Sequence, residues 1–322
     1  MRYVDPNSRP LAGTKTMTLP FFLSRYFCLQ ALLLASIGCF SIAAANDNKT
    51  ETVSASITQG QKMCTCGHSF HYFMPPILAE MAKAGEIIGH EQVGQSYIGG
   101  SRIIQHWDVP EDKNKVKELL KAGKVNVLTL SPIHLPDQGI GNFVKLAAEN
   151  NPHVRITLQE NWLPFDIFDV TFTLRPAKVD HNAISFEQLK ELHEPYFEGL
   201  DEQVRELNKK IGKEVVFAVP VGQSVNALRD KVIAGQAPGI KTQEDLFSDP
   251  LGHVKGHVMA LNAYCHYAVI YRKSPIGLPV PAILKTAKLG DDEEKLNRLL
   301  QELAWDAVTK HPLSGVKTGA NP

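Results

Sequence analysis

Five short apolar runs alternate with helical patterns along this chain, and this alternation constrains the fold more than any other feature of the sequence. The runs read KMCTC (62–66), HEQVG (90–94), VNVLTL (125–130), VRITLQ (154–159) and EVVFAVPV (214–221). The helical patterns between them cover residues 75–87, 111–123, 140–150 and 185–212. Parallel strands need such crossovers, which cover both faces of the sheet. The sequence therefore predicts an α/β fold, a three-layer α/β/α sandwich around a five-stranded parallel sheet.

The charge balance limits the classes of partner. The 322 residues include 34 Lys and Arg and 34 Asp and Glu, so the formal net charge is +0. This composition provides no bulk electrostatic attraction to nucleic acid or anionic lipid. A neutral small molecule or a polysaccharide fits it better than a polyanion does.

An apolar stretch near the N-terminus is typical of an export signal. Arg25 precedes YFCLQALLLASIGCFSIAAA, which is short for a membrane span and ends in small residues. We predict a signal peptide over 1–45, with Met17 as an alternative start, and no stable membrane span after its cleavage. SIGC, ending at Cys39, has the form of a lipoprotein box, although Ser36 stands where leucine is preferred. The predicted location is periplasmic or secreted, and lipid anchoring at Cys39 is the less favoured alternative.

The rest of the chain is predicted to be one domain. Residues 46–60 are polar and predict a linker, and the domain follows over 61–322. Residues 163–212 are interpreted as an insertion that forms part of a substrate wall. The apolar stripe of the last helical pattern predicts a C-terminal helix that packs on the sheet.

Cysteine usage excludes a disulfide-rich scaffold. Only Cys64, Cys66 and Cys265 remain after the predicted cleavage, which is too few for a stapled secreted domain of this length. Cys64 and Cys66 alternate along a predicted strand and so share one face. We expect them to be buried as small hydrophobic side chains.

The segment GHSFHYFMPP, after the first predicted strand, places a serine at a strand-to-helix turn. A serine hydroxyl becomes a nucleophile beside a base, and it needs N–H donors for the developing oxyanion. The turn supplies exposure and a helix N-terminus, with Gly67 allowing a tight bend. Ser69 is therefore a candidate nucleophile. The alternative is that Ser69 caps the following helix.

The segment SDPLGH supplies an acid and a base. Asp249 and His253 come after the fifth predicted strand and its helix, and ligands of open α/β sheets lie beyond the carboxyl ends of the strands. A histidine oriented by a carboxylate can take the proton of a serine hydroxyl. We therefore expect Ser69, His253 and Asp249 to meet at one edge of the sheet. The alternatives are a helix cap for Asp249 and a surface position for His253.

A glycine pair follows the second predicted strand in YIGGSR. Gly100 can bring its backbone N–H close to a bound oxyanion because no side chain blocks the approach. The alternative is an ordinary turn. Trp107 and Trp162 also lie beyond strand ends, where they either stack on a sugar ring or pack in the core.

These segments resemble the SGNH (GDSL-like) hydrolase superfamily, specifically a divergent branch among exported proteins of planctomycete type. The resemblance spans about 61–281 and rests on GHSFHYFMPPILAEMAKAG, IGGSRIIQHWD, QENWLPFD and LFSDPLGHVKGHVMALNAYCHYAVIYRKSPIGLPVP. It implies a flavodoxin-like sheet and cofactor-free hydrolysis of esters, often acetyl groups on carbohydrates. It gives Ser69 the position of the nucleophile and Gly100 that of an oxyanion glycine. Asp249 and His253 take those of the acid and the base.

Three departures from the family pattern leave the activity open. His68 stands where the first block usually has Asp, and the last block, Asp-x-x-x-His, is one residue longer than usual. The third block, normally Gly-x-Asn-Asp, is missing after VNVLTL, and His134 or Asn161 is the candidate replacement for its oxyanion donor. Losing one such donor costs about 10²–10³ in turnover. The alternative to an esterase is therefore a carbohydrate-binding relative with weak or no activity.

A metal-dependent hydrolase is a further, less favoured interpretation. Asp249, His253 and His257 are spaced by four residues, which on a helix would stack them on one face. Pro250 and Gly252 disfavour a regular helix there. The sequence therefore predicts catalysis without a metal or a cofactor.

Overall fold

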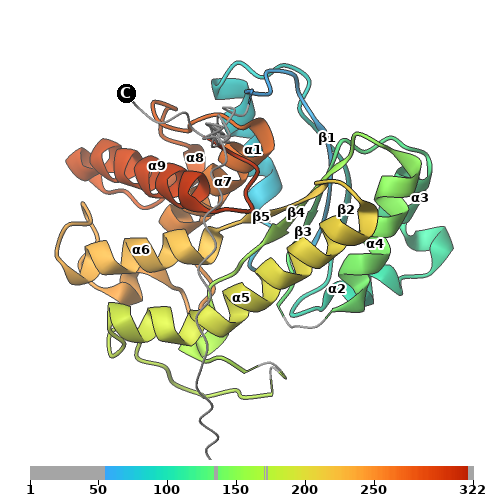
Figure 1. The fold of residues 1–322 in the computed structure, drawn as a ribbon. Coiled ribbons are helices and arrows are strands. Elements are labelled where there is room, and N and C mark those ends of the chain that lie inside the picture. The colour runs from blue at the N-terminus through green and yellow to red at the C-terminus, as the bar shows by residue number, and fades with distance from the viewer. Residues whose placement is uncertain (1–54, 134–136, 170, 172, 318–322) are drawn as a thin grey trace, which may run out of the picture. The chain divides into compact units, whose positions relative to one another are not determined.

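The computed structural model describes residues 55–133, 137–169, 171 and 173–317 (Figure 1). The chain divides into two units, residues 1–49 and 50–322, and every described residue belongs to the second. The predicted signal peptide, with Cys39, and most of the predicted linker lie outside the described residues. Near the end of that linker, Ile57 donates a backbone hydrogen bond to the carbonyl oxygen of Tyr271 (2.7 Å). The folded body therefore begins before residue 61.

Five parallel strands form one sheet in the order β2-β1-β3-β4-β5. They are β1 (Lys62–Gly67), β2 (Glu91–Tyr97), β3 (Val127–Leu130), β4 (Arg155–Gln159) and β5 (Val216–Val219). This confirms the predicted five-stranded parallel sheet, and its order is the flavodoxin-like one. Because all the strands run the same way, the loops that follow them lie at one edge of the sheet. The order switches direction between β1 and β3, which is where such sheets place their ligands.

Helices cover both faces of the sheet, and each face has its own apolar core. On one face lie α1 (Met74–Ala84), α6 (Val221–Ile233), α7 (Gly256–Tyr271) and α9 (Glu293–Lys310). On the other lie α2 (Ile103–Trp107), α3 (Lys115–Lys121), α4 (Gln138–Asn150) and α5 (Phe186–Ile211). Neighbouring strand residues point to opposite faces, so Met63 joins the first core and Cys64 joins the second with Cys66. The fold is the predicted three-layer α/β/α sandwich.

The ends of α5 follow from its sequence, and its position corrects one prediction. Ser185 and Gln188 form a capping box at its start, and Gly212 closes its end with a left-handed φ of +79°. The 26-residue helix connects β4 to β5 and contacts β5, so it is the regular crossover. The insertion predicted over 163–212 is therefore limited to the loop before α5, because residues from Phe186 onward form the helix of a regular β-α-β unit.

Helix α7 is buried along almost its whole length, between α1 and α9. A helix surrounded by protein has apolar residues on every face, as the run AVIY near its end shows. Its burial anchors the loop that precedes it, which contains Asp249 and His253. The predicted C-terminal helix, α9, packs mainly on α7 and α6 rather than on the sheet, because α7 already covers the strands.

Shorter elements complete the described chain. They are α8 (Ala282–Lys285) and the 3₁₀ turns η1 (Glu111–Lys113), η2 (Pro164–Asp166), η3 (Gln243–Leu246) and η4 (Gly290–Asp292). The helix predicted over 111–123 is divided because Asn114 leaves the helical conformation and its side chain caps the N–H of Lys117 (3.1 Å). Within the described ranges, none of the helices has the length and apolar character that crossing a bilayer requires.

Candidate active site

Ser69 lies half-buried in the turn between β1 and α1. The N–H groups of His71 and Tyr72 both donate to the carbonyl oxygen of His68 (3.0 and 3.1 Å), which folds the chain tightly around Ser69. Helix α1 begins only at Met74, after an N-cap at Phe73 that makes no side-chain hydrogen bond. The alternative in which Ser69 caps this helix is therefore wrong.

Gly67 is required here for space rather than for its backbone conformation. Its φ is not positive, but a Cβ at this position would lie 2.9 Å from Cδ2 of His71. The His71 ring is held there by hydrogen bonds to Gln159 (2.7 Å) and Thr129 (2.9 Å). The expected role of Gly67 in bending the chain is thus replaced by close packing against this ring.

Asp249 folds its own loop. One carboxylate oxygen of Asp249 accepts hydrogen bonds from the N–H groups of Gly252 (3.1 Å) and His253 (3.0 Å). Ser248 closes the loop by donating its N–H to the carbonyl oxygen of His253 (2.7 Å). Gly252 has a φ of +94°, which favours glycine. The N-cap of α7 is Lys255, so the alternative in which Asp249 caps that helix is wrong.

The structure brings Ser69, His253 and Asp249 together from segments 184 residues apart. His253 Nε2 lies 2.8 Å from Ser69 Oγ, and His253 Nδ1 lies 2.5 Å from the second carboxylate oxygen of Asp249. Burial acts to raise the pKa of Asp249, but the hydrogen bonds from His253 and Gly252 outweigh it and lower the pKa below its usual value. The carboxylate therefore holds the ring proton on Nδ1, and the Nε2 lone pair faces the Ser69 hydroxyl.

Phe70 and Trp162 position the imidazole. The Phe70 ring stacks on Trp162, with 4.5 Å between the ring centroids. It lies at right angles to the His253 ring, with 5.7 Å between those centroids. The indole N–H of Trp162 donates to the carbonyl oxygen of Gly252 (2.9 Å), the residue before His253. Trp162 is 1% exposed and Trp107 packs against Phe143, so both tryptophans fit the core-packing alternative.

Gln159, the last residue of β4, links the buried polar groups beneath the Ser69 turn. Its amide oxygen lies within hydrogen-bond distance of His71 (2.7 Å), His266 (2.9 Å) and Asn262 (3.2 Å). Its amide nitrogen donates to the carbonyl oxygen of Phe70 (3.0 Å). Burial lowers the pKa of His71 to about 4, so this ring is neutral at neutral pH. Gln159 is not among the residues predicted from the sequence, and the available signal was a polar residue that ends an apolar strand.

Gly100 lies in a loop that begins beside the Ser69 turn. Ile98 donates its N–H to the carbonyl oxygen of Gly67 (3.3 Å), and Gly100 then adopts a left-handed φ of +61°. The next residue, Ser101, is fixed by a hydrogen bond to the buried ring of His106 (2.6 Å). The loop therefore lies beside the Ser69 turn and is fixed at both ends by hydrogen bonds. The oxyanion role of Gly100 stays a prediction.

Asp137 has a structural role in the loop after β3, where the third block of the family pattern is missing. Its buried carboxylate accepts from the N–H groups of Ile103 (2.6 Å), Ile104 (3.0 Å) and Gly139 (2.9 Å). It therefore caps α2 and α4 together, and so ties the loop that contains Gly100 to the loop after β3. No sequence signal distinguished Asp137, because its partners come from two separate segments.

The two candidate replacements for the third-block donor have different outcomes. His134 lies outside the described residues. Asn161 is buried after β4, and its amide nitrogen donates to the carbonyl oxygen of Pro132 (2.8 Å) and the hydroxyl of Ser131 (3.2 Å). In this structure the Asn161 amide therefore braces the loop after β3, and its use as an oxyanion donor would require those bonds to break.

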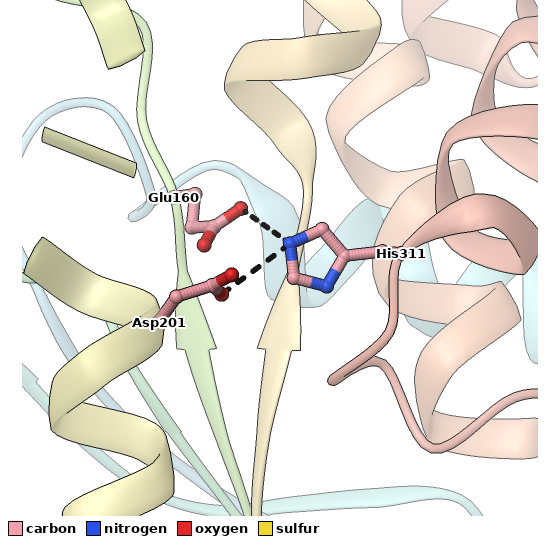
Figure 2. A group of neighbouring side chains, drawn as sticks. All are labelled: Glu160, Asp201 and His311. Carbon is pink, nitrogen blue, oxygen red and sulfur yellow. Dashed lines mark ion pairs between the residues drawn. The ribbon is translucent and has the colours of Figure 1, made fainter. Parts of the chain in front are cut away.

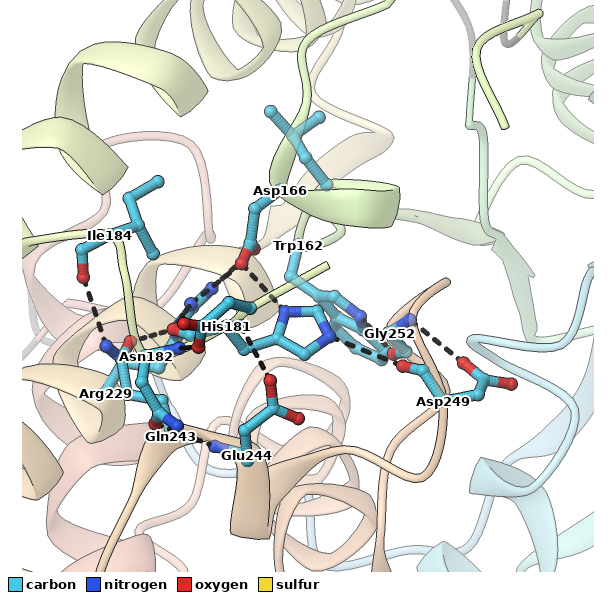
Figure 3. A network of polar contacts seen from close by, with 12 residues as sticks. Trp162, Asp166, His181, Asn182, Ile184, Arg229, Gln243, Glu244, Asp249 and Gly252 are labelled. Carbon is cyan, nitrogen blue, oxygen red and sulfur yellow. Dashed lines mark hydrogen bonds and ion pairs between the residues drawn. The ribbon is translucent and has the colours of Figure 1, made fainter. Parts of the chain in front are cut away.

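A buried ion-pair network contacts the Asp249 loop through His181 (Figure 3). Arg229 donates two hydrogen bonds to Asp166 (2.6 and 2.9 Å), and Asp166 lies 2.8 Å from Nδ1 of His181. The other ring nitrogen of His181 lies 3.3 Å from the carbonyl oxygen of Asp249. Burial acts to raise the pKa of Asp166, but hydrogen bonds from His181 and Arg229 lower it to about 2. The network keeps its charges paired and fixes the backbone at Asp249.

The structure does not assemble the metal site that the four-residue spacing allowed. Both ring nitrogens of His253 already have partners in Ser69 and Asp249. His257 lies in the first turn of α7, against a separate cavity that Lys241 and Asp245 also line. Among the described residues, the one cluster with metal-ligand geometry is Glu160, Asp201 and His311.

Comparison with known proteins supports the fold. No protein-family model matches the sequence, and a search of curated proteins finds no match. A DUF4886 family protein from Bacteroides uniformis is similar over 81% of this chain and 98% of its own, with 12% identity and a TM-score of 0.50. A GDSL-like lipase from Parabacteroides merdae (66% and 95% covered, 13% identity, TM-score 0.38) and WcbI, a polysaccharide biosynthesis enzyme (80% and 92%, 14%, 0.33), are more weakly similar. At such identities the first likeness concerns the α/β fold alone, and the other two support no statement about activity.

Proposed function

We propose that this chain is a serine hydrolase that cleaves ester bonds. The observation that carries the proposal is the continuous contact from Ser69 Oγ through the His253 ring to Asp249, at 2.8 and 2.5 Å. Hydrogen-bond contact between a nucleophile and a base, with the base held by a third group, is the geometry that activates a serine.

The first half of the proposed reaction forms an acyl-enzyme. Ser69 Oγ attacks the ester carbonyl carbon while Nε2 of His253 takes the hydroxyl proton. The C=O electron pair moves onto the oxygen, which gives a tetrahedral oxyanion. The imidazolium, stabilised by the Asp249 carboxylate, then donates its Nε2 proton to the leaving alcohol oxygen as the C–O bond breaks.

The second half regenerates the enzyme by the same proton path. Water loses a proton to Nε2 of His253 as its oxygen attacks the acyl carbon. Collapse of the second tetrahedral intermediate breaks the bond to Ser69 Oγ, which recovers the proton. We assign the oxyanion to the backbone N–H groups of Ser69 and Gly100, in the two loops that Ile98 and Gly67 join.

We propose an acylated carbohydrate as the substrate class, with acetyl esters first. The support is the zero net charge, the family resemblance and a pair of exposed aromatic rings beside the turn. Tyr72 is 48% and Tyr97 50% exposed, and their ring centroids lie 5.1 Å apart. Tyrosine rings so exposed offer apolar faces to a sugar. Export to the periplasm or the medium, as the N-terminal sequence predicts, would bring the protein to polysaccharide.

The test is turnover of p-nitrophenyl acetate and acetylated xylan by the wild type and two serine variants. Ser69→Ala removes the nucleophile. Ser56→Ala is the matched control because, among the described residues, its hydroxyl has a single hydrogen bond, at an exposed position, to the carbonyl oxygen of Arg272. We expect acetate release by the wild type and Ser56→Ala, and a loss of about 10⁴ or more in kcat/KM for Ser69→Ala. Equal rates for the wild type and Ser69→Ala would refute the assignment.

One observation favours the second candidate, a carbohydrate-binding relative with little or no turnover. The Asn161 amide is engaged by Pro132 and Ser131, so a side-chain oxyanion donor is not in place among the described residues. Binding of oligosaccharide to the wild type, measured by calorimetry, without any acetate release would support this candidate over the esterase.

A further inference from the structure

A second cluster of charged side chains lies away from Ser69, between β4, α5 and the end of α9. Figure 2 shows Glu160 and Asp201 both directed toward the ring of His311. Glu160 follows β4 directly, Asp201 lies on α5, and His311 follows α9. Nε2 of His311 lies 3.4 Å from a carboxylate oxygen of Glu160 and 3.5 Å from one of Asp201. Three separate segments thus converge on one point.

Several oxygen atoms at this point have no hydrogen-bond partner in the described part of the protein. They are Oε1 of Glu160, the amide oxygens of Gln223 and Asn226, and Oδ1 of Asp201, which lies 3.5 Å from the His311 ring. The amide nitrogen of Gln223 donates to the other carboxylate oxygen of Glu160. Glu160 is fully buried and Asn226 is 4% exposed. A buried polar atom without a partner costs about 1–3 kcal/mol. The unpartnered Oε1 of the fully buried Glu160, beside Asp201 and His311, indicates a group that the protein itself does not supply.

The cluster is open to a cavity of about 700 Å³ between α5 and α6. Asp201, Gln223, Asn226 and His311 line one part of it. The rest of the lining consists of three apolar residues, Phe186, Phe197 and Ala227, and of four glutamates and one lysine of α5: Glu187, Glu191, Glu194, Glu198 and Lys190. The excess of negative charge favours a cation over an anion, and the cavity offers a path to the cluster.

We propose that Glu160, Asp201 and His311 bind a divalent transition-metal cation of the Zn²⁺ or Mn²⁺ type. A tetrahedral ion with ligands at about 2.0–2.1 Å separates neighbouring ligand atoms by roughly 3.4 Å, which matches the two distances from His311. A direct imidazole–carboxylate hydrogen bond would be about 2.7–2.9 Å. One imidazole nitrogen with two carboxylate oxygens suits these metals, and water from the cavity completes the set.

Binding requires one local change at His311. The N–H of Leu313 now lies 3.2 Å from Nδ1 of His311, which places the ring proton on Nε2, between the carboxylates. Coordination through Nε2 moves that proton to Nδ1, and the contact with Leu313 then has to open. Metal binding therefore competes with a proton and with one long hydrogen bond in the segment after α9.

The expected role of the metal is structural, because it joins β4, α5 and the chain after α9. Glu160 also precedes Asn161 and Trp162, so the ion anchors the start of the segment that braces His253. The ligands contact none of Ser69, His253 or Asp249 in the structure, so binding is measurable without any reference to ester hydrolysis.

The test measures metal retained by the full chain after stripping with chelator, loading with ZnCl₂ and dialysis. We expect about one equivalent of Zn²⁺ and a higher melting temperature. Asp201→Asn, which keeps the side-chain shape, should weaken Zn²⁺ binding by about 100-fold or more and abolish the shift, as should His311→Gln. Circular dichroism checks that each variant is folded. If His311→Gln is unfolded, Asp201→Asn alone decides the outcome.

Two controls place the ion. Glu194→Gln removes a carboxylate from the same cavity outside the cluster and should bind Zn²⁺ as the wild type does. His253→Ala should also retain binding, which excludes the candidate catalytic residues as the site. Titration with MnCl₂ and MgCl₂ should follow the order Zn²⁺, Mn²⁺, Mg²⁺ from tight to weak. The proposal is refuted if the wild type retains no Zn²⁺ or if Asp201→Asn binds it equally well.

Discussion

His253 and His311 both lie beside carboxylates, and their surroundings differ in exposure and in distance. The side chains of His253 and Asp249 are 36% and 39% exposed and in direct contact at 2.5 Å. His311 is 9% and Glu160 0% exposed, and their nearest atoms are 3.4 Å apart. The first pair has a serine hydroxyl on its second nitrogen, whereas the second has unpartnered oxygens around it. The same residue types therefore suit proton transfer at one place and cation binding at the other.

A third pair, His181 and Asp166, shows what happens when the charge is already balanced. Two hydrogen bonds from Arg229 neutralise Asp166, and both nitrogens of His181 have partners. This pair braces the Asp249 loop and leaves neither a free lone pair nor an unpartnered oxygen. The partners of a histidine–carboxylate pair, rather than the pair itself, therefore decide its chemistry.

The largest expected effect separates the first two sites. Asp249→Asn removes the group that holds the His253 ring proton on Nδ1, and we expect kcat/KM for p-nitrophenyl acetate to fall about 10⁴-fold. Asp201→Asn should leave it within about twofold, because Asp201 contacts none of the proposed catalytic groups. Steady-state kinetics of both variants check this, and a similar loss in both would contradict separate roles for the two sites.

The next effect concerns stability at the balanced pair. Asp166→Asn leaves the 1%-exposed guanidinium of Arg229 without its charge partner, and we expect the free energy of unfolding to fall by about 3–5 kcal/mol. Asp306→Asn is the matched control because its ion pair with Lys310 is exposed, so its cost should stay below about 1 kcal/mol. Urea unfolding measures both, and equal costs would contradict the role of burial.

A smaller effect is the pH dependence of the same pair. The pKa of Asp166 falls from 3.8 to about 2 on folding, so the unfolded chain binds the proton more tightly. The stabilisation, about 2 kcal/mol, is therefore fully present above about pH 4 and is lost as the pH falls through 2. Urea unfolding at pH 5 and pH 2.5 should show the difference between the wild type and Asp166→Asn shrinking. A difference that stays the same at both pH values would show that folding does not lower the pKa of Asp166.

The smallest effect tests the positioning of His253. Trp162→Phe keeps a ring against Phe70 but removes the N–H that donates to Gly252, a loss of about 1 kcal/mol. We expect kcat to fall about fivefold with little change in KM, since the imidazole is less well held. Trp107→Phe, on the opposite helical layer, is the control and should leave kcat unchanged. An unchanged kcat in Trp162→Phe would show that Phe70 alone positions the ring.

Much of the fold could be predicted from local pattern. Each predicted strand is present, because runs such as VNVLTL carry their own β propensity and are bounded by polar turns. The predicted helix boundaries were wrong where a single side chain sets the helix end, as at Asn114, whose side-chain cap divides a helical pattern. The short helix α2 was not predicted, because five residues carry too little periodicity and its start depends on Asp137, which lies 34 residues away from Ile103.

The candidate site was predictable in its residue types and only partly in its contacts. Ser69, Asp249 and His253 stood out because each follows a strand or precedes a helix in a polar loop. Gln159 and Asp137 did not, and the contact of Trp162 with Gly252 was not predicted, since the importance of these residues comes from partners far along the chain. The cluster of Glu160, Asp201 and His311 has no spacing motif at all, and only packing brings it together.

The parallel α/β architecture and the loops at the carboxyl edge of the sheet can be derived from the sequence, because both depend on hydrophobic period and strand order along the chain. Which carboxylate each histidine meets, at what distance and with how much water, was set by the packing of the folded chain. Those quantities depend on how distant segments pack, and a difference of about one ångström there separates a proton-transfer contact from a space that fits a metal ion.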